Sequence, residues 1–197
     1  MSDIADRYRL LSDGFLARIR ATPADRWEAV SPCAGWTARD VVAHVINGHR
    51  GILAMVDGTP PTPADGVGVS AMADAPEVEP GADLGVAFAR CRDDMYAMLS
   101  DPDRAATRLR GGPLGPAPVE QAGDLIGGME LLVHTWDLAR AVGGDERLDP
   151  GLVARTHHAL LPHHAALLAT VAFRPSIPAP HDADPQTAFL SFVGRRA

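Results

Sequence analysis

Apolar side chains recur at helical spacing along the chain. In residues 3–20 they fall at steps of three and four: Ile4, Tyr8, Leu11, Phe15 and Ile19. A second stripe, in residues 84–98, is formed by Leu84, Phe88, Cys91, Met95 and Met98. Such steps place these side chains on one face of a helix, which must be buried against other elements. The pattern therefore predicts two amphipathic helices that share an apolar core.

Start and stop signals predict two more helices. Thr37 and Asp40 have the spacing of a capping box, in which the two residues satisfy each other's backbone N–H groups. A helix should begin there and run to about Val56. Another should begin after Pro118 and end before Gly143, because glycine is the residue that most often follows a helix C-terminus.

Proline-rich segments separate these helices. Residues 57–83 hold five prolines and six acidic side chains, which predict a long crossover connection rather than a turn. We expect this connection to be a mobile cover over the open side of the candidate metal site described below. A last helix, over about 150–172, is interrupted near Pro162. Since no segment favours a strand, the sequence predicts an all-α four-helix bundle with a long crossover connection and an extra C-terminal helix.

Composition and charge exclude several classes of protein. A chain of 197 residues, 46% hydrophobic and 22% charged, is typical of a single domain, which we place at residues 1–197. The net charge of -7 gives no positive field for nucleic acid or an anionic membrane. All 18 basic residues are arginine, which excludes lysine nucleophiles. Two cysteines, no N-terminal targeting pattern and no apolar stretch of about 20 residues predict a cytoplasmic protein.

Glu130 and His134 are candidate metal ligands within the fourth main helix. They stand four residues apart, which places both side chains on one helix face. Their neighbours are largely apolar, and a buried carboxylate needs a partner that offsets its lost hydration. His44, in the apolar run 41–46, is the candidate third ligand from a facing helix. A His-Glu-His set leaves coordination positions open, which is typical of catalytic zinc sites.

Ordinary structural roles stay open for the same residues. Glu and His at this spacing also form surface pairs on helices, and a core histidine is often only hydrogen-bonded. Asp137 either accepts a ring N–H from His134 or pairs with Arg140 at the helix end. Cys33, just before a helix start, is interpreted as a small buried hydrophobe rather than a reactive thiol. A solvated helix face is favoured for four clustered histidines: His157, His158, His163 and His164.

Two stretches of the chain carry a resemblance to a known family. They run from Ser31 to Val45 (SPCAGWTARDVVAHV) and from Leu131 to Arg140 (LLVHTWDLAR). Both resemble signature segments of the mycothiol-dependent maleylpyruvate isomerase family, within the DinB-like superfamily. The tail, 184–190 followed by Gly194-Arg195, is similar to that of a short actinobacterial metal-binding branch. The resemblance covers nearly the whole chain.

The resemblance implies a DinB-like four-helix bundle with one divalent metal ion. His44, Glu130 and His134 match the ligand positions of the family, so the resemblance assigns the ion to them. Zinc is the expected ion, with nickel or another divalent ion as the alternative. Mycothiol is the expected cosubstrate. The isomerase itself carries a further C-terminal domain that this chain ends too soon to contain, so maleylpyruvate isomerisation is not expected.

Two functions follow from these expectations. The first is a transferase or isomerase that depends on mycothiol or another low-molecular-weight thiol, in which a metal-activated thiolate attacks an electrophile. The alternative is a metal-binding or ligand-binding bundle that has lost the chemistry. The expected partners are therefore a small-molecule thiol and an electrophile, with no nucleic acid and no membrane. The sequence leaves a monomer and a homodimer open.

Overall fold

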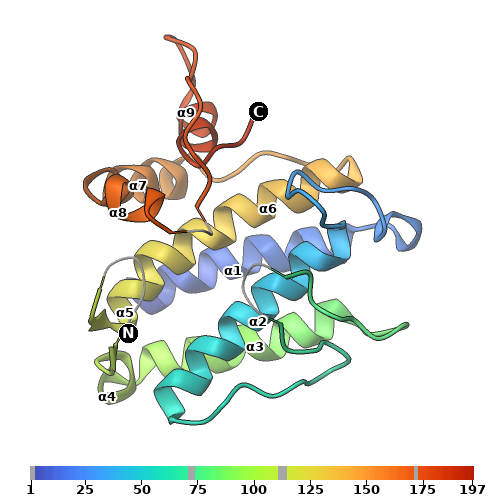
Figure 1. Cartoon of the computed structure of the whole chain (residues 1–197), viewed down its shortest axis with the longest axis vertical. Coiled ribbons are helices and arrows are strands. Elements are labelled where there is room, and N and C mark those ends of the chain that lie inside the picture. Colours follow the sequence, from blue (N-terminus) through green and yellow to red (C-terminus); the bar gives the residue numbers. More distant parts are fainter. Residues whose placement is uncertain (1–2, 71–73, 111–114, 171–172) are drawn as a thin grey trace.

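Four long helices form the body of the molecule. The computed structural model describes residues 3–70, 74–110, 115–170 and 173–197. Each long helix packs against two of the others, so that α1 and α2 both lie between α3 and α6 (Figure 1). This arrangement confirms the predicted all-α, DinB-like four-helix bundle. The bounds are α1 (Asp3–Ala21), α2 (Ala38–Asp57), α3 (Leu84–Ser100) and α6 (Gly128–Val142).

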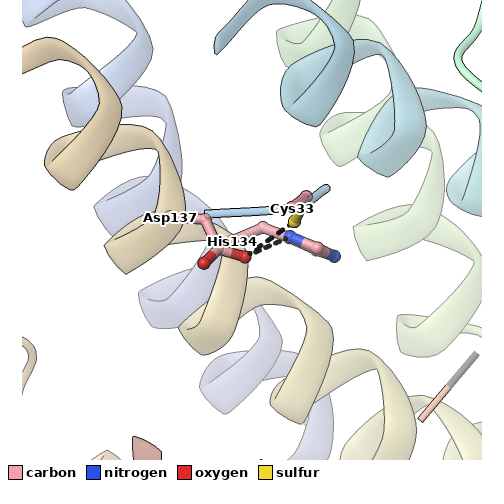
Figure 2. Close-up of side chains that lie close together, drawn as sticks. All are labelled: Cys33, His134 and Asp137. Atoms are coloured by element: carbon pink, nitrogen blue, oxygen red, sulfur yellow. Dashed lines mark hydrogen bonds and ion pairs between the residues drawn. The ribbon is translucent and has the colours of Figure 1, made fainter. Parts of the chain in front are cut away.

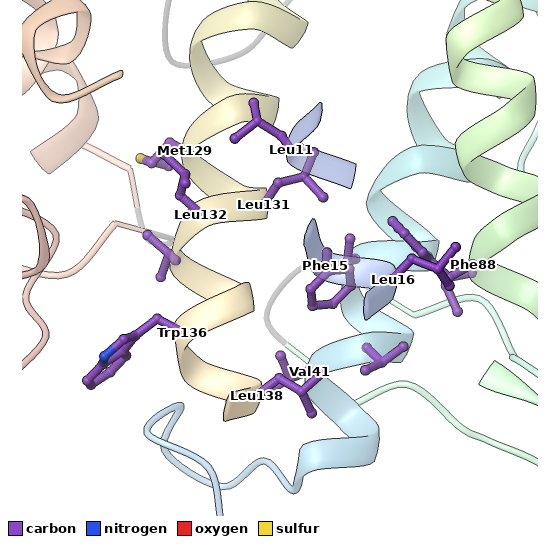
Figure 3. Packing of buried hydrophobic residues seen from close by; sticks show 14 of the residues in the cluster. Leu11, Phe15, Leu16, Val41, Phe88, Met129, Leu131, Leu132, Trp136 and Leu138 are labelled. Atoms are coloured by element: carbon purple, nitrogen blue, oxygen red, sulfur yellow. The ribbon is translucent and has the colours of Figure 1, made fainter. Parts of the chain in front are cut away.

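The core lies where the apolar stripes of these helices meet. Phe15 of α1 and Phe88 of α3 pack edge to face, with ring centroids 5.0 Å apart. Leu131 and Leu138 of α6 are fully buried on the side that faces α1 and α2 (Figure 3). Each buried side chain of this size contributes about 1.5–3 kcal/mol to the free energy of unfolding. The predicted helices of residues 3–20 and 84–98 are confirmed.

The start of α2 is fixed by the capping box. The Thr37 hydroxyl accepts the Asp40 N–H over 3.3 Å, and the Asp40 carboxylate accepts the Thr37 N–H over 2.8 Å. The helix ends at Asp57, where Gly58 takes the left-handed conformation with φ 69°. Because the cap sets where the helix begins, it also sets which face of α2 carries His44.

The predicted fourth helix is divided into three parts. A short helix, α5 (Val119–Ala122), leads into a π-helical stretch, η2 (Gly123–Gly127), and then into α6. A π-helical stretch adds a residue to the turn, and such stretches are frequent at functional sites. This one ends three residues before Glu130. The sequence pattern of a single helix from Pro118 missed this division.

Two connections also differ in part from expectation. A 3-10 turn η1 (Ala24–Arg26), a short helix α4 (Pro102–Ala105) and two-residue strands β1 (Arg108–Leu109) and β2 (Ala117–Pro118) lie between the main helices. The strands pair antiparallel, so the prediction of no strand is wrong there.

In its described part, the acidic crossover connection packs on the bundle and forms polar contacts with it. Val67 is buried in the core, and its carbonyl accepts Nη1 of Arg50 of α2 over 2.9 Å. Asp65 pairs with Arg90 of α3. The predicted long crossover connection is thus confirmed. Its polar contacts are with Arg50 of α2 and Arg90 of α3. The role of a mobile cover stays a prediction, and residues 71–73 of the connection lie outside the described part.

The C-terminal region groups on the α6 side of the bundle, away from α3 (Figure 1). The predicted break near Pro162 is confirmed, but the helix after it ends earlier than predicted, and residues 171–172 lie outside the described part. A further helix, missed by the sequence pattern, begins with Asp184 as its N-cap. Its Phe192 packs on His157 and His164, so these two histidines are not simply solvated. The elements are α7 (Pro150–Leu160), η3 (Leu161–His163), α8 (His164–Leu168) and α9 (Pro185–Phe192).

Within the described residues, no helix combines the length and apolar character needed to cross a membrane.

Candidate metal centre

The structure brings the three predicted ligands together between α2 and α6. Nε2 of His44 lies 3.3 Å from Oε2 of Glu130, and Nε2 of His134 lies 3.0 Å from the same oxygen. The two imidazole rings are nearly perpendicular, with centroids 5.0 Å apart. One turn of α6 supplies Glu130 and His134, and the neighbouring helix supplies His44. Whether they bind a metal ion stays a prediction.

The geometry of this cluster fits a small divalent ion. One ligand atom from each residue lies within 4.8 Å of the other two. Zinc–ligand bonds of about 2.0–2.2 Å in a tetrahedron place ligand atoms about 3.4 Å apart, close to the two distances above. The Glu130 side chain is 30% exposed, whereas those of His44 and His134 are 12% and 7% exposed. A ligand could therefore approach from the Glu130 side.

Asp137 fixes the orientation of the His134 ring. Its Oδ2 accepts Nδ1–H of His134 over 3.1 Å, and Asp137 is fully buried (Figure 2). With Nδ1 committed to the carboxylate, Nε2 is the nitrogen that faces Glu130. Metal-binding histidines commonly use their second nitrogen in this way. Of the two alternatives for Asp137, the pair with Arg140 is wrong, because Arg140 pairs with Glu146 over 2.7 Å.

Arg195 is the residue of this site that the sequence pattern did not single out. It follows α9, and its guanidinium holds Asp137 with two hydrogen bonds, Nε to Oδ1 over 3.0 Å and Nη2 to Oδ2 over 2.9 Å. Both partners are buried. The resemblance of the tail at Gly194-Arg195 was the one signal that could have pointed to it. The C-terminal segment therefore contributes a side chain to the Asp137 side of this site.

Cys33 belongs to the same polar cluster. Its Sγ lies 3.2 Å from Oδ2 of Asp137 and 3.3 Å from Nη2 of Arg195. It is buried as expected, but the interpretation as a plain hydrophobe is incomplete. Cys33, His134 and Asp137 form a second group close enough to hold an ion (Figure 2). The charge of Arg195 already occupies that side and would repel one, so the His44 side suits a cation better.

Hydrogen bonds keep Glu130 ionised in spite of its surroundings. Burial by itself would raise the pKa of this carboxyl. The hydrogen bonds from His134 and His44 outweigh burial and hold the pKa of Glu130 well below its usual range. Glu130 therefore presents a full negative charge between two imidazoles, which is the charge state that a metal ligand requires.

The Asp137 side of the site is likewise charged. Burial would raise the pKa of Asp137, but hydrogen bonds from His134 and Arg195 lower it to about 2. Burial would also lower the pKa of His134, and the hydrogen bonds to Asp137, Cys33 and Glu130 instead raise that pKa well above its usual value. A divalent ion at Nε2 would take the place of the proton there.

Trp36 forms an apolar wall of the site. Its ring lies 4.6 Å from the His44 ring and 6.5 Å from the His134 ring, measured between centroids. Trp36 stands immediately before Thr37, the N-cap of α2, so the cap that starts the helix also places this ring. The wall limits the access of water to His44 on that side.

Comparisons with known proteins place the chain in a family. Residues 8–139 match the family model described as the mycothiol maleylpyruvate isomerase N-terminal domain, a range that includes His44, Glu130 and His134 but not Arg195. Two uncharacterized proteins from two strains of Mycobacterium tuberculosis are each 27% identical to the chain over 197 aligned residues. Each alignment covers 93% of this chain and 92% of the relative. No solved structure matches the chain.

Proposed function

The chain belongs to the mycothiol maleylpyruvate isomerase N-terminal domain family, and from this premise we propose that it binds one divalent metal ion through His44, Glu130 and His134. The convergence of two imidazoles and a carboxylate within 4.8 Å of one another carries the proposal. Zinc suits this set of ligands best, and nickel or another divalent ion is the alternative. Three protein ligands leave room for a fourth ligand from solution.

A low-molecular-weight thiol is the proposed cosubstrate, with mycothiol, the thiol in the family's description, as the first to test. When bound, a divalent ion would keep a coordinated thiol deprotonated at neutral pH. No cysteine of the chain is then needed as nucleophile, and Cys33 is committed to Asp137 and Arg195. The proposed reaction is thiol transfer to a small electrophile or its thiol-assisted isomerisation.

The residues of the chain have separate tasks in this proposal. Asp137 holds the His134 ring so that Nε2 faces the ion, and Arg195 holds Asp137. Glu130 brings the negative charge that offsets the ion, and Trp36 excludes water on one side. Because Arg195 binds within the bundle, we also propose that residues 1–197 act as one domain.

The second candidate is a metal-binding or ligand-binding protein without catalysis. One observation favours it: the charged groups at the site are engaged with each other. Glu130 contacts two imidazoles, and Asp137 contacts His134 and Arg195. A reaction that requires proton transfer to the product would need one of these groups to be released or water to serve instead.

Metal content and thiol consumption test the two candidates. We expect the zinc-loaded protein to hold one ion per chain by elemental analysis, and His134→Ala to lose it. His158→Ala, on the exposed face of α7, is the matched control and should keep full metal content. A His134→Ala protein with full occupancy would reject the site.

Catalysis is measured separately on the loaded protein. Mycothiol and a panel of electrophiles are incubated with the protein, and free thiol is followed over time. Loss of thiol above the uncatalysed rate, abolished by His44→Ala, supports the enzyme. Stoichiometric metal with no thiol consumption supports the non-catalytic candidate.

A further inference from the structure

Four arginines line one hollow beside the C-terminal segment. Arg140, Arg174, Arg195 and Arg196 surround a cavity of about 370 Å³, with Trp136 in its wall. This is a concentration of positive charge in a chain whose net charge is -7. The volume lies within the range of about 300–1,000 Å³ that is typical of small-molecule sites.

Two of the four charges are neutralised within the chain. Arg195 is paired with Asp137, and Arg140 is paired with Glu146 over 2.7 Å. Arg174 and Arg196 have no carboxylate partner among the described residues. The one hydrogen bond of the Arg174 guanidinium in that part of the chain is to the neutral carbonyl of Pro32, over 3.3 Å.

Trp136 adds an apolar surface and a donor to this wall. Its ring projects from α6 on the side away from Leu131 and Leu138 (Figure 3) and is 1% exposed. The Arg140 guanidinium lies over the ring, 4.6 Å from its centroid. The indole Nε1–H is buried and has no hydrogen-bond partner in the described part of the chain. A buried N–H without a partner is unfavourable, which favours a ligand or water near it.

We propose that this hollow binds a small organic anion through a carboxylate or phosphate group held by Arg174 and Arg196. Guanidinium groups match both kinds of oxyanion with paired, charge-assisted hydrogen bonds. An anion would neutralise the two charges that the chain leaves without a partner.

The anion site is distinct from the metal centre. Arg195 lines the hollow and also binds Asp137, which in turn binds Nδ1 of His134. The metal ligands use the opposite ring nitrogen, Nε2. The two sites thus lie at the ends of one chain of contacts, and the anion site does not depend on a bound metal.

Calorimetric titration of the full chain tests the proposal. Inorganic phosphate is the probe in one arm and succinate in the other, at an ionic strength held constant with sodium chloride. We expect saturable binding of one anion per chain in at least one arm, and the stronger arm identifies the group. Arg174→Gln and Arg196→Gln should each weaken binding about tenfold, because each removes a charge-assisted hydrogen bond.

Two control variants show whether anion binding depends on this hollow. Arg155→Gln removes the same charge from α7, outside the hollow, and should leave the affinity unchanged. His44→Ala should keep anion binding while it loses metal, so the two proposals fail separately. Absence of binding in both arms would overturn the proposal, as would an Arg155→Gln loss equal to that of Arg196→Gln. Arg196 is exposed, so its replacement should not disturb the fold.

Discussion

The two ring nitrogens of His134 face opposite environments. Nε2 lies 3.0 Å from Glu130, on the side where the carboxylate is partly exposed. Nδ1 lies 3.1 Å from Asp137, which is fully buried and bound to Arg195. Both sides bring together three groups that could ligate a metal ion. The difference is that one side already contains a fixed cation.

The two groups are alike in the proximity of their ligand atoms and differ in their charge balance. The Arg195 guanidinium donates two hydrogen bonds to the Asp137 carboxylate and neutralises its charge. No negative charge is then left on that side for a divalent ion to neutralise. On the other side, Glu130 is balanced by imidazoles, which can exchange a proton for an ion. The contacts on the buried side orient the His134 ring, and the partly exposed side is the one that we propose for the metal ion.

Loss of Arg195 should have the largest effect on stability. Arg195→Ala removes one of the two cationic partners of the buried Asp137 carboxylate and leaves His134 as the other. Removal of one partner of a buried pair costs about 3–5 kcal/mol in the free energy of unfolding. Urea denaturation measures the change. Arg196→Ala, at the exposed neighbouring position, is the control and should change stability by less than about 0.5 kcal/mol. Equal stability of both variants would mean that the buried pair is not formed.

The pKa of a buried histidine on the same helix as His44 is shifted in the opposite direction to that of His134. His49 lies in the core, with Nδ1–H donated to the Val45 carbonyl over 2.8 Å. Burial lowers its pKa to about 4, although that hydrogen bond and the charge of Glu130 oppose the shift, while His44 adds to it. The ring packs on Tyr8 of α1 and Phe88 of α3.

Protonation of His49 makes the free energy of unfolding depend on pH in a definite direction. The unfolded chain takes up a proton at His49 near pH 6.5, and the folded chain does so only near pH 4. The free energy of unfolding should therefore fall as pH decreases through this window, by about 3 kcal/mol in total. His49→Phe should remove that part of the slope, measured by urea denaturation at pH 7 and pH 4.5. An identical slope in both proteins would show that His49 is not buried in its neutral form.

Replacement of Asp137 should weaken metal binding without removing a ligand. Asp137→Asn keeps the shape but loses the charge that holds the His134 ring, and such changes reduce metal affinity about 10–100-fold. Competition with a chelating dye measures the affinity, with circular dichroism to verify folding. Glu146→Gln is the control. It removes a carboxylate charge from the pair with Arg140 and should leave the metal affinity unchanged. A drop in both variants would indicate a general charge effect.

Cys33 should show the smallest effect. Cys33→Ala removes a buried thiol from the Asp137 side, which we expect to cost about 1 kcal/mol in the free energy of unfolding. Metal content should stay at one ion per chain, because the thiol is not among the proposed ligands. Loss of the ion in this variant would transfer the site to the Cys33 side of His134.

Local patterns in the sequence predicted much of the fold. The stripes of α1 and α3 and the capping box at Thr37 depend on residues a few positions apart, so they can be recognised without knowledge of the fold. The Glu130–His134 contact is local for the same reason. His44 was proposed from its apolar surroundings and from the family resemblance, and its proximity to Glu130 required the structure.

Features that depend on distant contacts were missed. Arg195 is 58 residues from Asp137, and no pattern around either residue predicts that they pair. The helix α9 is short and follows a proline-rich stretch, so the sequence pattern did not predict it. The π-helical stretch before α6 also required the structure, because its glycines fit an ordinary helix end as well.

Anomalous diffraction from crystals of the zinc-loaded protein would locate the bound ion relative to His44, Glu130 and His134. The proposed site requires one peak at the zinc absorption edge, about 2.0–2.2 Å from Nε2 of His44, Nε2 of His134 and the Glu130 carboxylate. Arg195 should remain bound to Asp137 in the same crystal. A peak against Cys33 and Asp137 with Arg195 displaced, or no peak in the bundle, would contradict it.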